Sequence, residues 1–167
     1  LYPDKLPEFK PRRWYFDLEW DVKDDFTSVM AVVDSDLETP VVFAWTDDRT
    51  NCSYPETGRH CETHKRKVRD EEYELHLSFS EASMHRNFID FLHERDPDIL
   101  VAHAIMWADL PHLMRRLKDP DQLSPLGQVV RPFKTRDGYK ETQQPIKGRL
   151  CFDSASKHES GSGFETI

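Results

Sequence analysis

Residues 96–104 read Asp96-Pro97-Asp98-Ile99-Leu100-Val101-Ala102-His103-Ala104, and their order decides the class of fold. The four apolar residues 99–102 are typical of a short strand buried on both faces of a parallel sheet. Asp96-Pro97 closes a helical pattern that Ser80 is suited to cap. That helix is predicted from apolar residues at helical spacing: Met84, Phe88, Ile89, Phe91 and Leu92. A second helix is predicted over 109–118, so the strand lies between two helices, as in α/β folds.

More strands are predicted on either side of this unit. Residues 14–20 form an aromatic-rich, β-prone run, and residues 26–33 and 41–45 are rich in β-branched and aromatic residues. Three consecutive strands joined by short links favour an antiparallel meander. Residues 72–79 alternate apolar and polar side chains, and residues 150–153 predict the last strand. Together these elements predict an α/β domain of RNase H-like type, in which a mixed sheet of three antiparallel strands followed by parallel strands is flanked by helices.

The composition supports one globular domain. Of the 167 residues, 37% are hydrophobic and 11% aromatic, which excludes a chain that is disordered by default. We divide the chain into an extended lead-in at residues 1–12 and one domain at residues 13–167. Acidic residues outnumber basic ones 31 to 23, and the net charge of −8 argues against a protein that coats nucleic acid by bulk charge.

The sequence shows no signal for a membrane or for oxidative folding. No apolar run approaches the ~18 residues of a membrane span, and the start at Leu1 has no basic region followed by an apolar stretch. The cysteines, three in number, make a poor disulfide framework and suit a reducing compartment. We therefore expect an intracellular protein of the cytoplasm, nucleoid or nucleus, with no membrane partner.

Asp17-Leu18-Glu19, at the end of the first predicted strand, is the sharpest candidate for chemistry. Because a strand has a period of two, both carboxylates lie on one face of the sheet. Two such acids can share hard divalent cations, since Mg²⁺ and Mn²⁺ prefer oxygen ligands. Paired ions are suited to clamp the attacking and leaving oxygens of a phosphodiester. Taken alone, the same residues also fit the plain end of a surface strand.

Residues 96–104 are followed, after a few residues, by Asp109-Leu110-Pro111-His112-Leu113. This pattern closely resembles the second exonuclease motif of family B DNA polymerases. Phe16-Asp17-Leu18-Glu19 resembles the first motif of the same family, and Gly148-Arg149-Leu150-Cys151-Phe152-Asp153 is similar to a Gly-Arg-x-x-x-Asp segment found downstream. The resemblance covers about residues 13–153, in the family's order and spacing.

The resemblance implies a 3′-to-5′ exonuclease domain that removes misincorporated nucleotides during DNA synthesis. By position, Asp17 and Glu19 are implied to be catalytic metal ligands from the first motif, and Asp109 the ligand from the second. The implied cofactors are two Mg²⁺ or Mn²⁺ ions, which activate water against the terminal phosphodiester. The implied partners are a single-stranded 3′ end of DNA and the remaining domains of a polymerase.

Departures from the family pattern bear on activity. The family's Gly and Asn are Ala102 and Ala104 here, and Ala108 stands where an aromatic residue precedes the aspartate. The third motif, Tyr-x-x-x-Asp, is missing, because Tyr139 is followed four positions later by Gln143. We therefore expect a domain cut short at its C-terminal side. The first alternative is an inactive module that binds DNA or braces the polymerase, and the second is an RNA-directed nuclease of the same fold.

Residues outside these motifs are candidate contacts to DNA. The basic region near the last predicted strand is the better candidate for tracking a single strand, with a solvated loop as the alternative. The candidate contacts are Trp107, Arg131, Lys134 and Arg136. A second basic run, Lys65-Arg66-Lys67 with Arg69, lies in a polar segment, residues 47–71, that predicts a long loop. We interpret that run first as a solvated surface.

The same predicted loop carries cysteine and histidine. Cys52, His60, Cys61 and His64 are zinc-type ligands, so a zinc-loop interaction protein is a further alternative, although the spacing lacks a Cys-x-x-Cys knuckle. An ordinary surface loop is the plain interpretation. His103 follows the strand at 99–102, and we interpret it as a structural hydrogen-bonding residue rather than a catalytic one.

Overall fold

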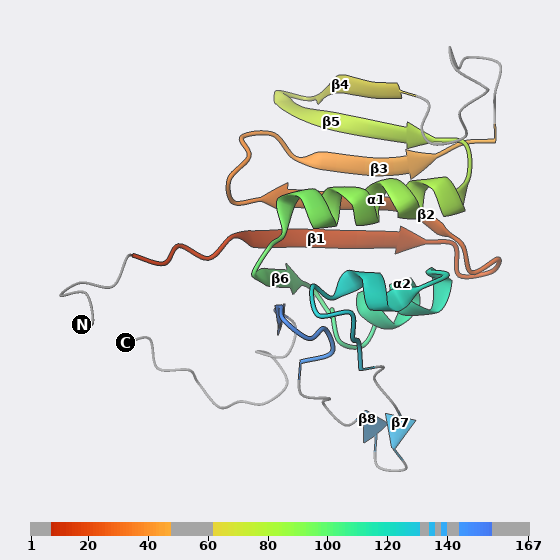
Figure 1. Ribbon diagram of the computed structural model, residues 1–167. Coiled ribbons are helices and arrows are strands. Elements are labelled where there is room, and N and C mark those ends of the chain that lie inside the picture. Colours follow the sequence, from red (N-terminus) through yellow and green to blue (C-terminus); the bar gives the residue numbers. More distant parts are fainter. Residues whose placement is uncertain (1–7, 48–61, 131–133, 136–137, 140–143, 155–167) are drawn as a thin grey trace.

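The computed structural model describes residues 8–47, 62–130, 134–135, 138–139 and 144–154. In chain order, its elements are β1 (Arg13–Trp20), β2 (Thr27–Asp34), β3 (Val41–Trp45), β4 (Glu62–Val68), β5 (Glu71–Ser78), α1 (Glu81–Arg95), β6 (Ile99–Ala102), α2 (Asp109–Arg116), the 3₁₀ helix η1 (Pro120–Leu123), β7 (Lys134–Thr135), β8 (Gly138–Tyr139) and β9 (Leu150–Asp153). Figure 1 shows how they are arranged. Among the described residues, none of the helices is long and apolar enough to cross a membrane.

Seven strands form one mixed sheet in the order β4-β5-β3-β2-β1-β6-β9. β1, β2 and β3 pair antiparallel, whereas β5 runs parallel to β3, β6 to β1, and β9 to β6. The predicted α/β class, with a mixed sheet of RNase H-like type, is therefore confirmed. β1 lies between β2 and β6, and its pairing with β2 continues to Trp20, whereas its pairing with β6 ends at Tyr15.

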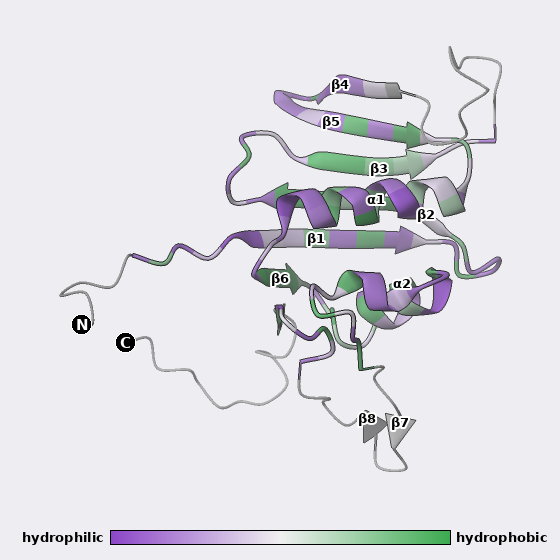
Figure 2. Cartoon of the chain, viewed as in Figure 1, coloured by the Kyte–Doolittle hydropathy of each residue, from purple (hydrophilic) through white to green (hydrophobic). Residues whose placement is uncertain are grey.

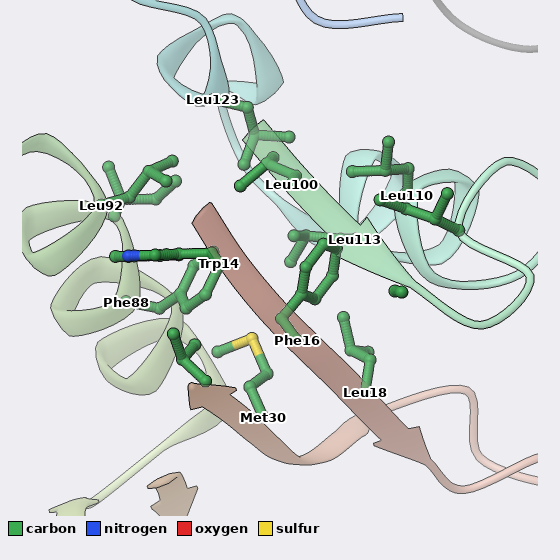
Figure 3. Close-up of a cluster of buried hydrophobic side chains, with 14 of the residues drawn as sticks. Trp14, Phe16, Leu18, Met30, Phe88, Leu92, Leu100, Leu110, Leu113 and Leu123 are labelled. Atoms are coloured by element: carbon green, nitrogen blue, oxygen red, sulfur yellow. The ribbon is translucent and has the colours of Figure 1, made fainter. Parts of the chain in front are cut away.

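The hydrophobic core lies between the sheet and the helices (Figure 3). Trp14, Phe16 and Leu18 of β1 are buried, because side chains of a strand point alternately to opposite faces. Phe88 of α1 and Leu113 of α2 belong to the same buried cluster. Both helices therefore cover the face of β1 that bears Trp14, Phe16 and Leu18.

Local signals set both ends of α1. Ser80 caps the N-terminus, where its Oγ accepts the Ser83 N–H at 3.2 Å, and the Ser83 Oγ accepts the Ser80 N–H at 3.1 Å. Asp96 ends the helix in the left-handed conformation, at φ 43°, directly before Pro97. The predicted cap and stop are confirmed, and α1 leads at once into β6.

The prediction of one long loop over 47–71 is wrong for its second half, where β4 lies. β4 is the edge strand and pairs only with β5 in this sheet. Its residues are largely hydrophilic, unlike those of the interior strand β3 (Figure 2). An edge strand buries little, so its sequence lacks the alternation that marks an interior strand. Lys65 and Lys67 lie opposite Glu74 and Glu72, so the predicted solvated basic run faces acidic residues across a hairpin.

Some other elements also differ from the prediction. The strands of the β7–β8 hairpin are absent from it, since two residues per strand give no readable period. α2 ends at Arg116, two residues before the predicted end. Of the predicted zinc-type residues, Cys52, His60 and Cys61 lie outside the described residues, whereas His64 stands on β4.

The other face of the sheet is more open in the described part of the chain. Tyr15 lies opposite Val33 and Val101, and Val101 lies opposite Phe152. Tyr15 is 49% exposed, Val33 47% and Phe152 54%. Residues two apart on a strand share a face, so this is also the face of the acidic residue Asp17.

Candidate active site: an acidic cluster where strand β6 ends

Two acidic residues of β1 lie where its pairing with β6 has ended. The last pair between the strands is Tyr15 with Val101, so Asp17 and Glu19 extend beyond it. Both side chains are exposed and alternate with buried neighbours. The expectation that the two carboxylates share one face of the sheet is met. On the other side they are held by β2, where Asp17 lies opposite Ala31.

Asp109 is the first residue of α2, and its carboxyl group is buried. The residue is 3% exposed, and in the described part of the chain its Oδ2 is the buried side-chain atom without a hydrogen-bond partner. Burial raises the pKa of Asp109 to about 7, with further increases from the negative charges of Asp17, Asp153 and Glu19. Asp17, Glu19 and Asp153 therefore act electrostatically on Asp109, and we call these four residues the acidic cluster.

Asp153 is a member of this cluster that the sequence analysis left out of its candidate site. It ends β9 and lies opposite Ala102, the last residue of β6. Its Oδ1 accepts the Ala104 N–H at 3.0 Å and its Oδ2 accepts the Met106 N–H at 3.3 Å. Asp153 thus fixes the turn between β6 and α2 that leads to Asp109. Its place at the carboxyl end of a strand parallel to β6 is the signal that points to it.

Gly148 and Arg149 fix the start of β9. Gly148 has φ +86°, and a Cβ there would meet the Pro125 Cγ at 2.6 Å. The buried guanidinium of Arg149 donates to the carbonyl oxygens of Leu123 and Pro97 and pairs with Asp96 Oδ1 at 3.0 Å. The Gly-Arg part of the Gly-Arg-x-x-x-Asp segment is therefore structural, and it sets where Asp153 lies.

The turn after β6 is built around a strained residue. Ala104 has φ +57°, a conformation that favours Gly or Asn. Its carbonyl oxygen accepts the N–H groups of Trp107 at 3.0 Å and Ala108 at 2.8 Å. Ala108 then begins α2 without a side-chain cap. Two of the residues that depart from the family pattern, Ala104 and Ala108, therefore lie between β6 and Asp109.

The remaining sequence-predicted residues do not join the acidic cluster. Trp107 is half-buried within the turn, and His103 is exposed at its start. Lys134 stands on β7. Arg131 and Arg136 lie outside the described residues. Of the implied metal ligands, Asp17 and Glu19 thus act on Asp109 through their charge, and the candidate DNA contacts stay predictions.

The acidic cluster fits a hard divalent cation in its chemistry. Its donors are carboxylate oxygens, the ligands that Mg²⁺ and Mn²⁺ prefer. The unpartnered Oδ2 of Asp109 is an acceptor that a cation would satisfy. Within the described ranges, no three His, Cys, Asp or Glu side chains stand at the spacing that encloses an ion. Asp17, Glu19 and Asp109 would hold the ions, with Asp153 occupied by backbone N–H groups.

Comparison with protein families gives a match over most of the chain. The family model for the exonuclease domain of DNA polymerase family B matches residues 28–158. The chain belongs to this family. Comparison with curated proteins gives no significant match. Among solved structures, the chain is similar to the family B DNA polymerase from the hyperthermophilic archaeon Pyrobaculum calidifontis, with a TM-score of 0.51 and 22% identity.

The chain corresponds to a small part of the archaeal polymerase. The structural match covers 92% of this chain and 16% of the archaeal polymerase. At that level of identity it supports the family B exonuclease fold. The family match includes Asp109 and Asp153 but begins after Glu19. The assignment of Asp17 and Glu19 therefore rests on their motif and on their charge effect on Asp109.

Proposed function

We propose that the acidic cluster is the active site of a 3′-to-5′ exonuclease that removes nucleotides from single-stranded 3′ ends of DNA. Asp17, Glu19 and Asp109 would bind two divalent cations, Mg²⁺ or Mn²⁺. The observation that carries the proposal is the buried, unpartnered Oδ2 of Asp109 among three other acidic residues. Such a group destabilises a fold unless it serves a ligand, because burial and like charges both disfavour its ionised form.

The four residues of the acidic cluster have different roles in the proposed site. Asp17 and Glu19 are exposed, so a substrate phosphate and water can reach them, whereas Asp109 is the buried first residue of α2. When bound, two divalent cations supply Lewis-acid activation of water and stabilise charge on the phosphate oxygens. A cation near Asp109 would favour its ionised form and reverse the effect of burial on its pKa. Asp153 holds the turn that keeps Asp109 in place.

The proposed setting is a DNA polymerase, with its remaining domains as partners. The supporting observations are the family match and the likeness to part of an archaeal polymerase. In this setting the substrate is the 3′ end of a newly made strand. Trp107, which belongs to the same turn as Ala104, is the aromatic residue that we assign to stacking against a terminal base.

An inactive module that binds DNA or braces the polymerase is the second candidate. Two observations favour it: the alanines at positions 104 and 108, and the absence, within the described residues, of three side chains at ion-binding spacing. The acidic residues at positions 17, 19 and 109 oppose it, since a purely structural module has no need for a buried, unpartnered carboxyl group such as that of Asp109.

The experiment that separates the two candidates measures Mn²⁺-dependent shortening of a 5′-labelled single-stranded DNA. The protein is compared with its Asp17→Ala variant and with an Asp24→Ala control, which removes an exposed acid from the turn after β1. Stepwise loss from the 3′ end that persists in the control and falls at least 100-fold in Asp17→Ala supports the exonuclease. If all three proteins bind the strand and none shortens it, the inactive module replaces the proposal.

A further inference from the structure

Thr27 is a fully buried hub between both helices and the β1–β2 hairpin. Its exposure is 0%, and all of its polar groups are bonded. The N–H donates to Glu81 Oε1 at 2.8 Å, and the carbonyl oxygen accepts the Trp45 indole N–H at 2.7 Å. The hydroxyl lies 3.1 Å from Nε2 of both His85 and His112. One threonine therefore joins β2 to α1 through His85 and to α2 through His112.

The proton positions in this network follow from the donor inventory. Arg115 lies with a guanidinium nitrogen 3.2 Å from His112 Nδ1, and a guanidinium only donates, so Nδ1 carries no proton. Neutral His112 must then carry its proton on Nε2 and donate to the Thr27 hydroxyl. That hydroxyl has one proton, which is left for His85 Nε2 to accept. The order of donation is fixed from Arg115 to His85.

The surroundings keep both imidazoles neutral at pH 7. Burial lowers the pKa of His85 to about 4 and is also the largest cause that lowers the pKa of His112. The charged groups facing them are paired in two sets. Glu81 binds Arg116 and lies 3.9 Å from His85, and Asp25 binds Arg115 at 2.9 Å and lies 3.6 Å from His112. The acids are thus neutralised by arginines rather than by the histidines.

His112 also joins α2 to the end of β1. Its ring stacks on Trp20 with centroids 4.7 Å apart and planes 19° from parallel. Trp20 lies opposite Thr27, and the register shifts between Glu19 and Trp20. Such irregularities re-aim side chains. On α2, His112 lies one turn after Asp109, on the same side of the helix. One imidazole therefore contacts the strand end that bears Glu19 and belongs to the helix that bears Asp109.

We propose that the Thr27 hydroxyl, between the neutral side chains of His85 and His112, is a positioning device that fixes α2 against the end of β1 and so sets the distance between Asp109 and Glu19. Thr27, His85 and His112 are positioning residues, since they act through the acidic cluster. The link to catalysis rests on the proposed exonuclease function, whereas the tautomers inferred for His85 and His112 are independent of that function.

The first test reads the tautomers by ¹⁵N NMR of the histidine ring nitrogens at pH 7.5, with His85→Asn and His112→Asn variants for assignment. The proposal requires a protonated Nε2 on His112 and an unprotonated Nε2 on His85. In Thr27→Val, which removes the hydroxyl, the His85 signal should change, and in Thr27→Ser it should return to the native position. The opposite tautomers, or rapid averaging in the native protein, would overturn the proposal.

The second test measures Mn²⁺ affinity by calorimetry in the same proteins. Thr27→Val should bind Mn²⁺ at least ten-fold more weakly, and Thr27→Ser should bind it as the native protein does. Ser78→Ala is the matched control, because it removes another fully buried hydroxyl, bonded to Asn87 on α1. Native affinity in Thr27→Val overturns the positioning role. If the native protein binds no Mn²⁺, the proposed exonuclease function is wrong. The hydrogen-bond network at Thr27 is then judged by the tautomer measurement alone.

Discussion

Asp153 Oδ1 accepts the Ala104 N–H at 3.0 Å, so the last residue of β9 is bonded to the turn that follows β6. The same carboxylate is one of the charges that raise the pKa of Asp109. Asp153 therefore affects Asp109 in two ways: its hydrogen bond holds the turn that precedes Asp109, and its negative charge raises the pKa of Asp109. An Asn amide separates most of the two effects: its oxygen still accepts the Ala104 N–H, the charge is removed, and only the longer bond from the Met106 N–H, at 3.3 Å, is lost.

Asp153→Asn should lower the pKa of Asp109 below its native value of about 7, because one of the surrounding negative charges is gone. The measurement is a ¹³C NMR titration of the Asp109 side-chain carboxyl. Asp98→Asn is the control: Asp98 accepts the Arg12 N–H at 2.8 Å and is not among the charges that act on Asp109. An equal change in both variants would show that net charge, rather than proximity, governs the pKa of Asp109.

Ala104→Gly should stabilise the protein by about 1 kcal/mol, because Ala104 has φ +57° and glycine adopts this conformation without strain. Urea denaturation measures the change. Ala82→Gly is the control, since this exposed alanine has helical backbone in the first turn of α1, where glycine costs up to about 1 kcal/mol. A loss of stability in both variants would mean that the positive φ of Ala104 carries no strain.

Much of the fold was predictable because its interior elements bury one face or both. The alternation of Trp14, Phe16 and Leu18 marks β1, and the apolar run at 99–102 marks β6. β4 was not predictable from pattern, because an edge strand such as 62–68 is held by backbone pairing rather than by burial.

The candidate site was predictable only where one motif carries its residues. Asp17 and Glu19 share a strand, and Asp109 follows a recognisable strand and turn. Asp153 ends the Gly-Arg-x-x-x-Asp segment, but its place beside the turn that precedes Asp109 depends on the register of β9 against β6. Thr27 bonds to His85, which is 58 positions away in the sequence, and to His112, which is 85 positions away. These hydrogen bonds therefore form only in the folded chain.

Gly148→Ala should destabilise the protein by roughly 2–4 kcal/mol, because the strain of φ +86° adds to a contact of 2.6 Å between the new Cβ and Pro125 Cγ. Gly127→Ala is the matched control: its φ is +64°, yet nothing lies within 4 Å of the added Cβ, so only the strain of about 1 kcal/mol is expected. Thermal and urea unfolding give both values. Equal losses in the two variants would show that Pro125 moves aside without cost.

Asp109→Asn should stabilise the metal-free protein at pH 8 and have little effect near pH 4. The pKa of Asp109 is raised from an ordinary 3.8 to about 7 in the folded protein. Its carboxyl therefore contributes fully to stability below pH 3.8, and that contribution is lost as the pH rises through 7. A neutral amide avoids this loss, which amounts to at most about 4 kcal/mol. Urea denaturation in the presence of a chelator measures the difference.

In the presence of Mn²⁺ at pH 8, the native protein should be more stable than Asp109→Asn. A cation stabilises the folded protein that binds it, and Asp109→Asn lacks one of the proposed ligands. Asp24→Asn, at an exposed position in the turn after β1, serves as the control and should show no such pH dependence. If the gain in Asp109→Asn is the same at pH 4 and pH 8, it arises from packing rather than from charge. If Mn²⁺ stabilises both proteins equally, Asp109 is not a ligand, and the buried carboxyl would then lack the function proposed for it.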